Sequence, residues 1–102
     1  MDNTPDVMEV AKSGYNLLLE NNKVRVLEIK LKPGEKSPMH NHPNDHVIYV
    51  VKDAKFKLNF PNGETEVFEL VEGQVKWIKA GSHQTENIGS TDGHCIVVEN
   101  KC

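Results

Sequence analysis

Short runs of branched and aromatic residues, each bounded by turn residues, are the feature that most limits how this chain can fold. After position 15, such runs alternate with clusters of Gly, Pro, Asn and Asp. This spacing is typical of an all-β sandwich or barrel. It predicts strands within residues 15–20, 27–31, 47–51, 56–60, 65–71, 74–78 and 94–99. No stretch after residue 15 carries a helical apolar period, so the predicted fold class is all-β.

Some of these runs also predict which way their side chains face. Leu27, Ile29 and Leu31 alternate with charged residues, which indicates one buried and one solvent-exposed face. The run 47–51 is continuously apolar, as expected for a strand that is buried on both faces. Residues 61–64 form a Pro-Asn-Gly-Glu turn whose glycine can adopt positive φ, which predicts a β-hairpin.

A chain with many short antiparallel strands must protect the edges of its sheets. A jelly roll, in which two sheets fold over each other, protects them. Pairing of an edge strand with a second copy of the chain does so too, and we therefore expect a homodimer. Residues 1–14 are predicted to be a loose N-terminal arm, and residues 15–102 a single domain.

Charge and hydropathy argue against several classes of partner. The chain has 12 Lys and Arg against 15 Asp and Glu, and no basic stripe that would bind nucleic acid. No apolar run approaches the roughly 20 residues that span a bilayer, and residues 1–12 lack the apolar core of a signal peptide. Cys95 and Cys102 are too few for a disulfide framework. We therefore expect a cytoplasmic protein without a nucleic-acid or membrane partner.

Three histidines within seven residues are the main functional signal: His40, His42 and His46. Side chains at positions i and i+2 of a strand share a face, so His40 and His42 are predicted to point into the same space. Pro43 ends that strand, and a short corner allows the next strand to bring His46 back beside them. His83, which follows a break of small residues, is the best candidate for a fourth imidazole.

Converging histidines predict a divalent transition metal, because neutral imidazole is a common protein ligand for Fe, Ni, Cu and Zn. Without a cation, buried ring nitrogens would lack partners. The residues alone leave other roles open. His40, His42 and His83 could be loop residues, and His46 could be a satisfied histidine or a base beside the ligands. Nothing pairs His94 with the cluster, so it is predicted not to be a ligand.

The spacing around these histidines resembles the first sequence motif of the cupin family. That motif reads Gly, five residues, His-x-His, three or four residues, Glu, six residues and Gly. Here Gly34 is followed after five residues by His40-Asn41-His42. His46 stands at the family's Glu position, and Asp53 stands at its final Gly.

The second cupin motif is resembled further along the chain. It reads Gly, five residues, Pro-x-Gly, one or two residues, His, three residues and Asn. Here Gly73 precedes Lys79-Ala80-Gly81, in which Lys79 replaces Pro. His83 and Asn87 follow at the family's spacing. The resemblance covers about residues 15–99 and implies the double-stranded β-helix, a jelly-roll barrel, of a small RmlC-like cupin.

His46 in place of a carboxylate is the informative departure from the family. The resemblance implies a site of three or four histidines, as in β-diketone-cleaving dioxygenases or the small four-histidine manganese cupins. The implied ligands are His40, His42, His46 and His83. Neutral ligands would leave the metal's full +2 charge, which makes a stronger Lewis acid toward anionic ligands. Nitrogen ligands favour Fe, Ni, Cu or Zn over Mn, although metal supply can override that order.

Three functions stay open at this point. The first is an iron-type, dioxygenase-like enzyme that acts on a small carbonyl or enol compound. The second is a non-catalytic or sensory cupin that binds a metal or ligand, and the third is a redox-neutral isomerase or lyase. Arg25, Tyr49 and Gln84 are predicted to line the pocket as candidate catalytic groups, and Trp77 is predicted to lie in the core or the pocket wall.

Overall fold

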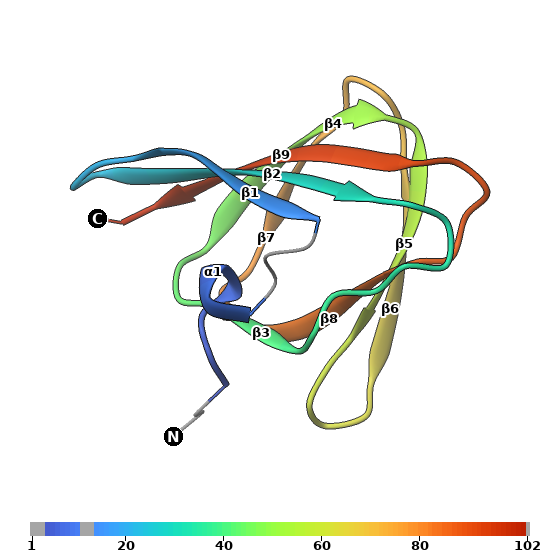
Figure 1. Cartoon of the computed structure of the whole chain (residues 1–102), viewed down its shortest axis with the longest axis horizontal. Coiled ribbons are helices and arrows are strands. Elements are labelled where there is room, and N and C mark those ends of the chain that lie inside the picture. Colours follow the sequence, from blue (N-terminus) through green and yellow to red (C-terminus); the bar gives the residue numbers. More distant parts are fainter. Residues whose placement is uncertain (1–3, 11–13, 102) are drawn as a thin grey trace.

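The chain folds into two antiparallel sheets that face each other, as the computed structural model shows for residues 4–10 and 14–101 (Figure 1). Cys102 lies outside these described residues. The described elements are α1 (Val7–Val10), β1 (Tyr15–Glu20), β2 (Val24–Leu31), β3 (His40–His42), β4 (His46–Lys52), β5 (Ala54–Asn59), β6 (Thr65–Leu70), β7 (Val75–Ile78), β8 (Gly81–Asn87) and β9 (Gly93–Asn100). The predicted all-β class is therefore confirmed.

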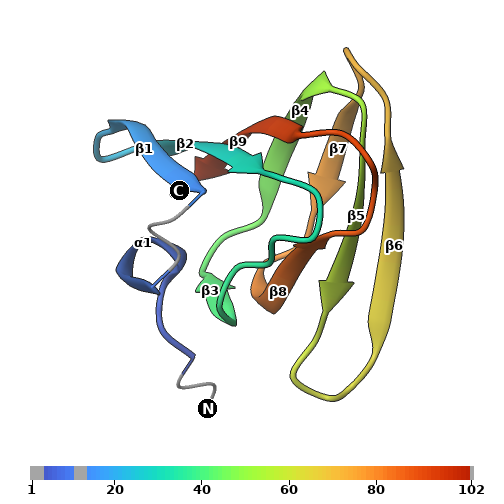
Figure 2. The same cartoon turned by 45° about the vertical axis from the view of Figure 1, so that its right-hand side comes forward.

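The two sheets divide the strands unevenly. The larger sheet has the order β1-β2-β9-β4-β7, and the smaller has the order β3-β8-β5-β6. Figure 2 shows the smaller sheet folded against the larger one, so that the two enclose the interior of a barrel. Strands that are distant in sequence pair within each sheet, as β2 does with β9. This is the jelly-roll arrangement that the motifs implied.

The inner faces of the sheets form the hydrophobic core, because alternate residues of each strand point inward. Buried apolar residues from five strands of both sheets belong to it: Leu27, Ile29, Leu31, Ile48, Val50, Ala54, Phe56, Leu70, Cys95 and Val97. The burial of Leu27, Ile29 and Leu31 confirms the predicted dry face of β2.

Strand β4 differs from its prediction. Ile48 and Val50 are buried, but Tyr49 between them is 46% exposed. Val47 and Val51 are only half-buried. The continuous apolar run therefore faces the core on one side only, since no described element covers the outer face of the larger sheet here.

Strand β8 is not predicted by the apolar pattern, because its sequence contains almost no large apolar residue. It lies between β3 and β5 in the smaller sheet. Its buried inward positions are polar: His83, Thr85 and Asn87. A polar strand in this place brings hydrogen-bonding groups into the barrel, and this is where the candidate site lies.

The predicted hairpin is confirmed. Strands β5 and β6 pair antiparallel from Ala54 opposite Leu70 to Asn59 opposite Thr65. Gly63 in the connecting turn has a φ of 89°, which only glycine adopts without strain. The hairpin extends the smaller sheet beyond β8 and so forms one wall of the barrel.

The described part of the N-terminal arm packs against the barrel and is not loose. Val7 is 0% exposed, and the Asn41 amide donates to the carbonyl of Pro5 at 2.7 Å. Asp6 forms an ion pair with Arg25. A domain boundary at residue 14 stays a prediction, and residues 1–3 and 11–13 of the arm lie outside the described residues. The helix found in the described chain is too short to cross a membrane.

Candidate metal centre

Strand β3 brings two histidines to the same face of the smaller sheet. His40 and His42 are buried at alternate positions, while Asn41 between them points the other way and is only half-buried. Pro43 ends the strand, as its sequence predicts. The register of β3 with β8 sets His40 directly opposite His83. Cross-strand pairing therefore adds a third imidazole from a part of the chain that is distant in sequence.

The three imidazoles form a compact cluster. Each of His40, His42 and His83 offers a ligand atom, and these atoms lie within 4.8 Å of one another. The ring centroids of His40 lie 4.9 Å from those of both His42 and His83. Three nitrogen ligands of one metal at about 2.0–2.1 Å must lie this close together, so the cluster has the size that a transition metal requires.

The hydrogen bonds of His40 leave one ring nitrogen free to bind a metal. Its Nδ1 lies 2.8 Å from the carbonyl oxygen of Pro38, and a carbonyl can only accept, so Nδ1 carries the proton. Its Nε2 is buried and makes no hydrogen bond. A buried acceptor without a donor is rare in proteins, and a cation would satisfy it. The cluster therefore fits a metal ion.

Burial also keeps these imidazoles in the neutral form that binds metals. Desolvation lowers the pKa of His40 to about 4, although the hydrogen bond to Pro38 opposes the shift. Desolvation and the neighbouring His42 lower the pKa of His83 to about 2. Both rings are therefore neutral near pH 7 without any metal, and binding a metal there would release no protons from them.

His46 lies beside the cluster but is not one of the three mutually close ligands. Its ring stands against that of His42, with centroids 4.5 Å apart. Its Nδ1 faces the carbonyl oxygen of Asn44 at 3.1 Å, which leaves Nε2 free. Burial lowers its pKa, as for the other members. Direct binding of the metal by His46 stays a prediction.

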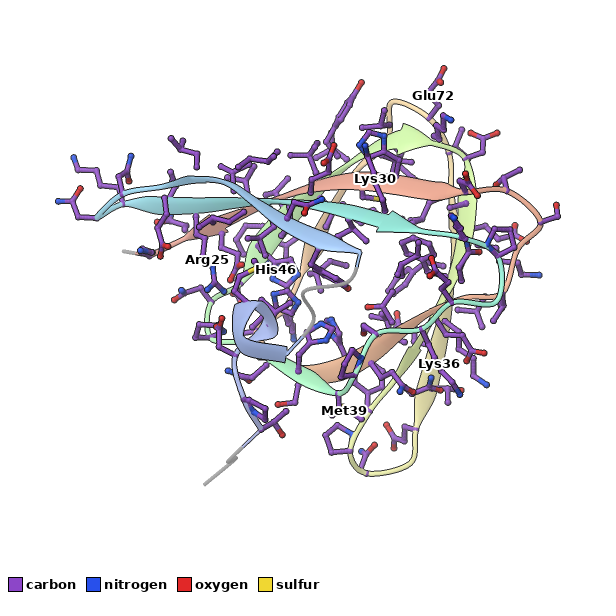
Figure 3. All side chains as sticks on the ribbon, in the orientation of Figure 1. Arg25, Lys30, Lys36, Met39, His46 and Glu72 are labelled. Carbon is purple, nitrogen blue, oxygen red and sulfur yellow. The ribbon has the colours of Figure 1, made fainter. Side chains whose placement is uncertain are left out.

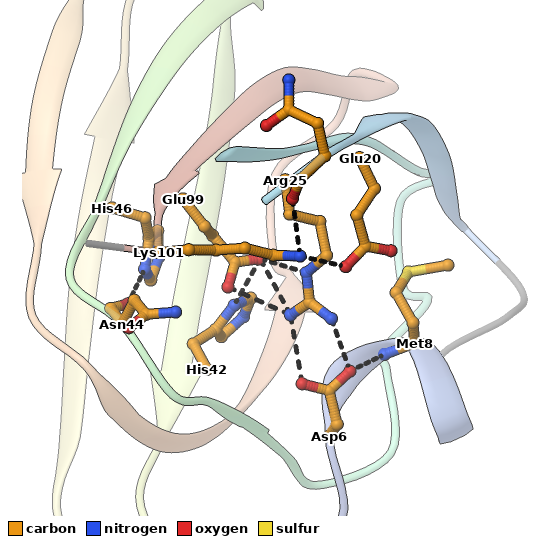
Figure 4. Close-up of polar contacts among 10 residues, drawn as sticks. Asp6, Met8, Glu20, Arg25, His42, Asn44, His46, Glu99 and Lys101 are labelled. Atoms are coloured by element: carbon orange, nitrogen blue, oxygen red, sulfur yellow. Dashed lines mark hydrogen bonds and ion pairs between the residues drawn. The ribbon is translucent and has the colours of Figure 1, made fainter. Parts of the chain in front are cut away.

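Sequence reasoning missed Glu99, which lies beside His42 (Figure 4). Its side chain is 0% exposed, and Oε2 lies 3.7 Å from Nδ1 of His42. Burial alone would raise the pKa of Glu99, but His42 and Arg25 hold it below its usual range. The signal was present, since Glu99 continues the inward alternation of Cys95 and Val97 along β9.

Arg25 connects Glu99 with the N-terminal arm. Its guanidinium donates to both oxygens of Glu99 and to both oxygens of Asp6, at 2.8–3.2 Å. Figure 3 shows Arg25 and His46 on the inner side of the larger sheet, whereas Lys30 projects from its outer side. Arg25 therefore lies behind the histidines and holds the carboxylate that stands next to His42.

The structure does not bring the other two candidate catalytic residues to the cluster. Tyr49 points outward from β4, because it alternates with the buried Ile48 and Val50. Gln84 alternates with the buried His83 and Thr85, so it faces away from the interior, where its Oε1 accepts from Asn59 at 3.2 Å. Both residues lie in strands that carry cluster histidines, but on the opposite faces.

His94 lies away from the cluster, on β9. Its Nε2 is 2.7 Å from Glu28 Oε2, and this hydrogen bond lowers the pKa of Glu28. Its side chain is 22% exposed. The structure thus gives His94 a carboxylate partner at the surface and no part in the metal centre.

The cluster faces a small cavity inside the barrel. The cavity has a volume of about 40 Å³, and its walls are mostly apolar. Besides histidines, Tyr15, Thr85 and Cys95 bring polar atoms to its lining. Tyr15 donates to Thr85 at 3.0 Å, and burial raises the pKa of Tyr15 to about 12 and that of Cys95 to about 11. Phenol and thiol therefore stay protonated, and the cavity offers no anionic base of its own.

A second hollow of about 450 Å³ adjoins this cavity on the side of β6 and β7. Leu58, Phe68, Ile78 and His83 line both spaces. Trp77, which is 63% exposed, forms part of the wall of the outer hollow. Trp77 is thus a wall residue rather than a core residue, and the outer hollow lies on a path from solvent to His83.

Solved structures with the same fold come from distant organisms. A cupin domain of Bordetella pertussis superposes with a TM-score of 0.77 at 22% identity, over 86% of this chain and 92% of that one. An RmlC-like cupin of Methanocaldococcus jannaschii gives 0.68 at 21%, over 84% and 77%. The polyketide cyclase RemF of Streptomyces resistomycificus gives 0.62 at 21%, over 86% and 64%. These likenesses establish the double-stranded β-helix fold.

Fold, motifs and buried histidines together define a small cupin, and the chain belongs to the RmlC-like cupin superfamily. Its sequence is 30% identical over 79 residues to the β-alanine degradation protein BauB of Pseudomonas aeruginosa. That alignment covers 78% of this chain and 80% of BauB. No family model matches the chain.

Proposed function

We propose that this protein is a small metal-dependent enzyme, of the dioxygenase-like kind, that acts on a small carbonyl or enol compound. The observation that carries the proposal is the unpaired Nε2 of His40 within three buried imidazoles. Structural stability gives no reason to bury such a group, because an unsatisfied acceptor costs about 1–3 kcal/mol. A bound metal gives it a partner.

A divalent transition metal held here would act as a Lewis acid toward a carbonyl or enolate oxygen and, as iron, could activate O₂. His40, His42 and His83 would hold it. The Pro38 carbonyl fixes the orientation and tautomer of His40. Glu99 stands 3.7 Å from Nδ1 of His42 and favours a proton on that nitrogen. The apolar walls keep bulk water away from the reacting atoms.

The size of the inner cavity limits the substrate. A volume of about 40 Å³ admits a few atoms beside the ligands, and no large ring system. The adjoining hollow of about 450 Å³ would hold the rest of the substrate against Phe68 and Trp77. Three neutral ligands leave the +2 charge of the metal uncompensated in the cavity, so an enolate or carboxylate is favoured over a neutral molecule.

The relative BauB supports the same substrate class, because its name assigns it to β-alanine degradation. Removal of the amino group from β-alanine leaves a three-carbon 3-oxo acid. Such an acid carries a carboxylate and a carbonyl that can enolise, and it is small. We therefore place 3-oxo acids beside 1,3-diketones at the head of a substrate panel.

The metal is tested first, by elemental analysis of protein purified without added metal. We expect about one transition-metal ion per chain, and near-complete loss in His40→Ala. The matched control is His94→Ala, which removes a histidine that pairs with Glu28 outside the cluster. Equal metal content in His40→Ala and His94→Ala would contradict the proposed site. The same assay on His46→Ala shows whether His46 binds the metal directly.

The reaction is tested next, with protein loaded with Fe²⁺ and the panel of 3-oxo acids and diketones. Substrate-dependent O₂ uptake is the expected result, and replacement of iron by Zn²⁺ should abolish it. Turnover that survives zinc and needs no O₂ would instead identify a redox-neutral isomerase or lyase. Metal binding without any turnover across the panel would identify a binding or sensory protein.

A further inference from the structure

We propose that the outer face of the larger sheet is the interface of a homodimer. The strands of this sheet turn their inner residues toward the core and the metal centre. Their outer residues are largely apolar, and no described element of the chain covers them. The feature is independent of the metal, so this proposal goes beyond the proposed function.

The apolar residues of this face lie in register across the whole sheet. One row runs through all five strands, in the order Leu19, Val26, Val98, Val47 and Trp77. A second row places Ile96, Tyr49 and Val75 beside one another. We call these eight residues the outer apolar face. Residues that pair across neighbouring strands have Cβ atoms about 4.5–5.5 Å apart, so the side chains of each row form one continuous surface.

These side chains are large and accessible. Trp77 is 63% exposed and Val75 is 62% exposed. Leu19, Tyr49 and Val98 are exposed by 53%, 46% and 38%. Single exposed apolar residues are common, but a contiguous apolar patch marks an interaction surface. The patch also explains why the apolar run of β4 predicts a strand that is buried on both faces.

The size of the face matches what a stable dimer needs. Strands about 4.8 Å apart, with a rise of about 3.3 Å per residue, give a five-stranded face of roughly 500 Å² before side-chain relief is added. A standard interface buries about 800 Å² of accessible surface per partner. Side chains that stand out from the sheet bring the accessible area of the face to this order.

A second copy of this chain fits the face better than other partners. Two sheets pack face to face at about 10 Å with strands within about 30° of each other, and a two-fold axis presents the same apolar rows to each other. Charged residues occur at one end of the face only, where Lys30 and Lys52 flank His94 in register. Apolar centre and charged rim is the composition of protein interfaces.

Face packing differs from the edge pairing that the strand pattern favoured. Strands β1 and β7 are the edges of the larger sheet. Face-to-face packing leaves their free backbone groups unpaired, but it covers Leu19 on β1 and Trp77 on β7 at the same time. The apolar rows end at these edges, so the interface extends over the full width of the sheet.

The experiment uses Trp77, the only tryptophan of the chain, as a probe of the interface. Sedimentation velocity of the wild-type protein over a dilution series should give twice the monomer mass at high concentration. The fluorescence emission of Trp77 should shift to longer wavelength over the same range in which the dimer dissociates, because dissociation exposes its ring to water. A protein that is monomeric at all concentrations, or a dimer in which Trp77 emission does not follow dissociation, would overturn the proposal.

Two substitutions locate the interface. Val98→Glu and Tyr49→Glu each put a charge into the outer apolar face and should raise the dimer dissociation constant by about 30-fold or more. The matched control is Val67→Glu on β6, which charges a residue that is 49% exposed in the other sheet and should leave the dimer intact. Circular dichroism checks that each variant is folded. Dissociation by Val67→Glu alone, or by none of the three in a dimeric wild type, would place the interface elsewhere and overturn the proposal.

Discussion

The two ends of the barrel interior are built from opposite kinds of side chain. One end holds buried polar and ionisable groups: His40, His42, His46, His83 and Glu99. The other end is filled by apolar side chains, which include Leu31, Val50, Phe56 and Leu70. The same strands supply both ends, since β4 runs from His46 to Val50 and β2 from Arg25 to Leu31.

This difference separates stability from function within one core. A buried apolar side chain stabilises the fold by about 1.5–3 kcal/mol, because it leaves water. A buried imidazole loses hydration instead, which is seen in the lowered pKa values of His40 and His83. We infer that the apolar end holds the barrel closed, so that the polar end can keep unpaired nitrogen atoms for a metal.

The largest effect is expected from replacing a ligand by an apolar side chain. His83→Leu should lower metal affinity by more than the roughly 10- to 100-fold that loss of an outer hydrogen-bond partner causes. The metal-free variant should be as stable as the wild type or more so, because an apolar group replaces a desolvated imidazole. Metal titration and urea unfolding measure the two effects. Strong destabilisation of the metal-free protein would show that the polar end contributes to stability.

The opposite change is made at the apolar end. Phe56→Ala should destabilise the protein by about 3–5 kcal/mol, because it removes a buried ring and leaves a cavity. The metal affinity of the remaining folded protein should not change, since Phe56 lies opposite Asn87 at the far end of β8 from His83. Urea unfolding and metal titration below the transition check both. Equal losses of stability and affinity would mean that the two ends are not separable.

Acid should destabilise the polar end selectively. The folded pKa values of about 4 for His40 and about 2 for His83 lie below the value of about 6.5 in an unfolded chain. The unfolded state therefore binds more protons in this window, and stability falls as the pH drops from about 6.5 toward 4. The slope for metal-free protein is up to about 1.4 kcal/mol per pH unit for each group.

Unfolding of the metal-free protein by urea at a series of pH values measures this slope. His83→Leu is the matched control, since it should remove the share of one group. A stability that stays constant between pH 6.5 and 4 in both proteins would contradict the neutral, buried state of these imidazoles.

A smaller effect is expected from the carboxylate beside His42. Glu99→Gln keeps the size of the side chain but removes the charge that faces His42 and Arg25. Metal affinity should fall by about 10- to 100-fold, as is typical when a ligand histidine loses its outer partner. Asp6→Asn is the control, because it changes the other carboxylate of Arg25 without touching a histidine. Similar losses in both variants would assign the effect to Arg25 and the arm.

The smallest effect is expected outside the barrel. Tyr49→Phe removes the hydroxyl from an exposed ring on the outer face of β4. Metal affinity and turnover should stay unchanged, and stability should stay within about 0.5 kcal/mol. A clear loss of turnover would restore Tyr49 as a catalytic residue and would require the pocket to be reached from the outer face.

Much of the fold follows from local patterns. The strands at residues 15–20, 65–70 and 75–78 match their predicted runs within one residue, and the turn at Gly63 follows from its chemistry. Strand β8 does not follow, because polar residues in a strand interior have low β-propensity unless the fold satisfies their hydrogen bonds. The fold does so here: Asn87 on β8 donates to the carbonyls of Leu31 and Thr91.

The candidate site divides in the same way. The sequence by itself determined that His40 and His42 share a face, since alternation along a strand is a local property. The tertiary structure decided that His83 lies opposite His40, that Glu99 stands beside His42, and that Tyr49 and Gln84 point away. These relations depend on strand register and on which face of each sheet is covered. Both are set by the packing of the whole barrel, and no local pattern carries them.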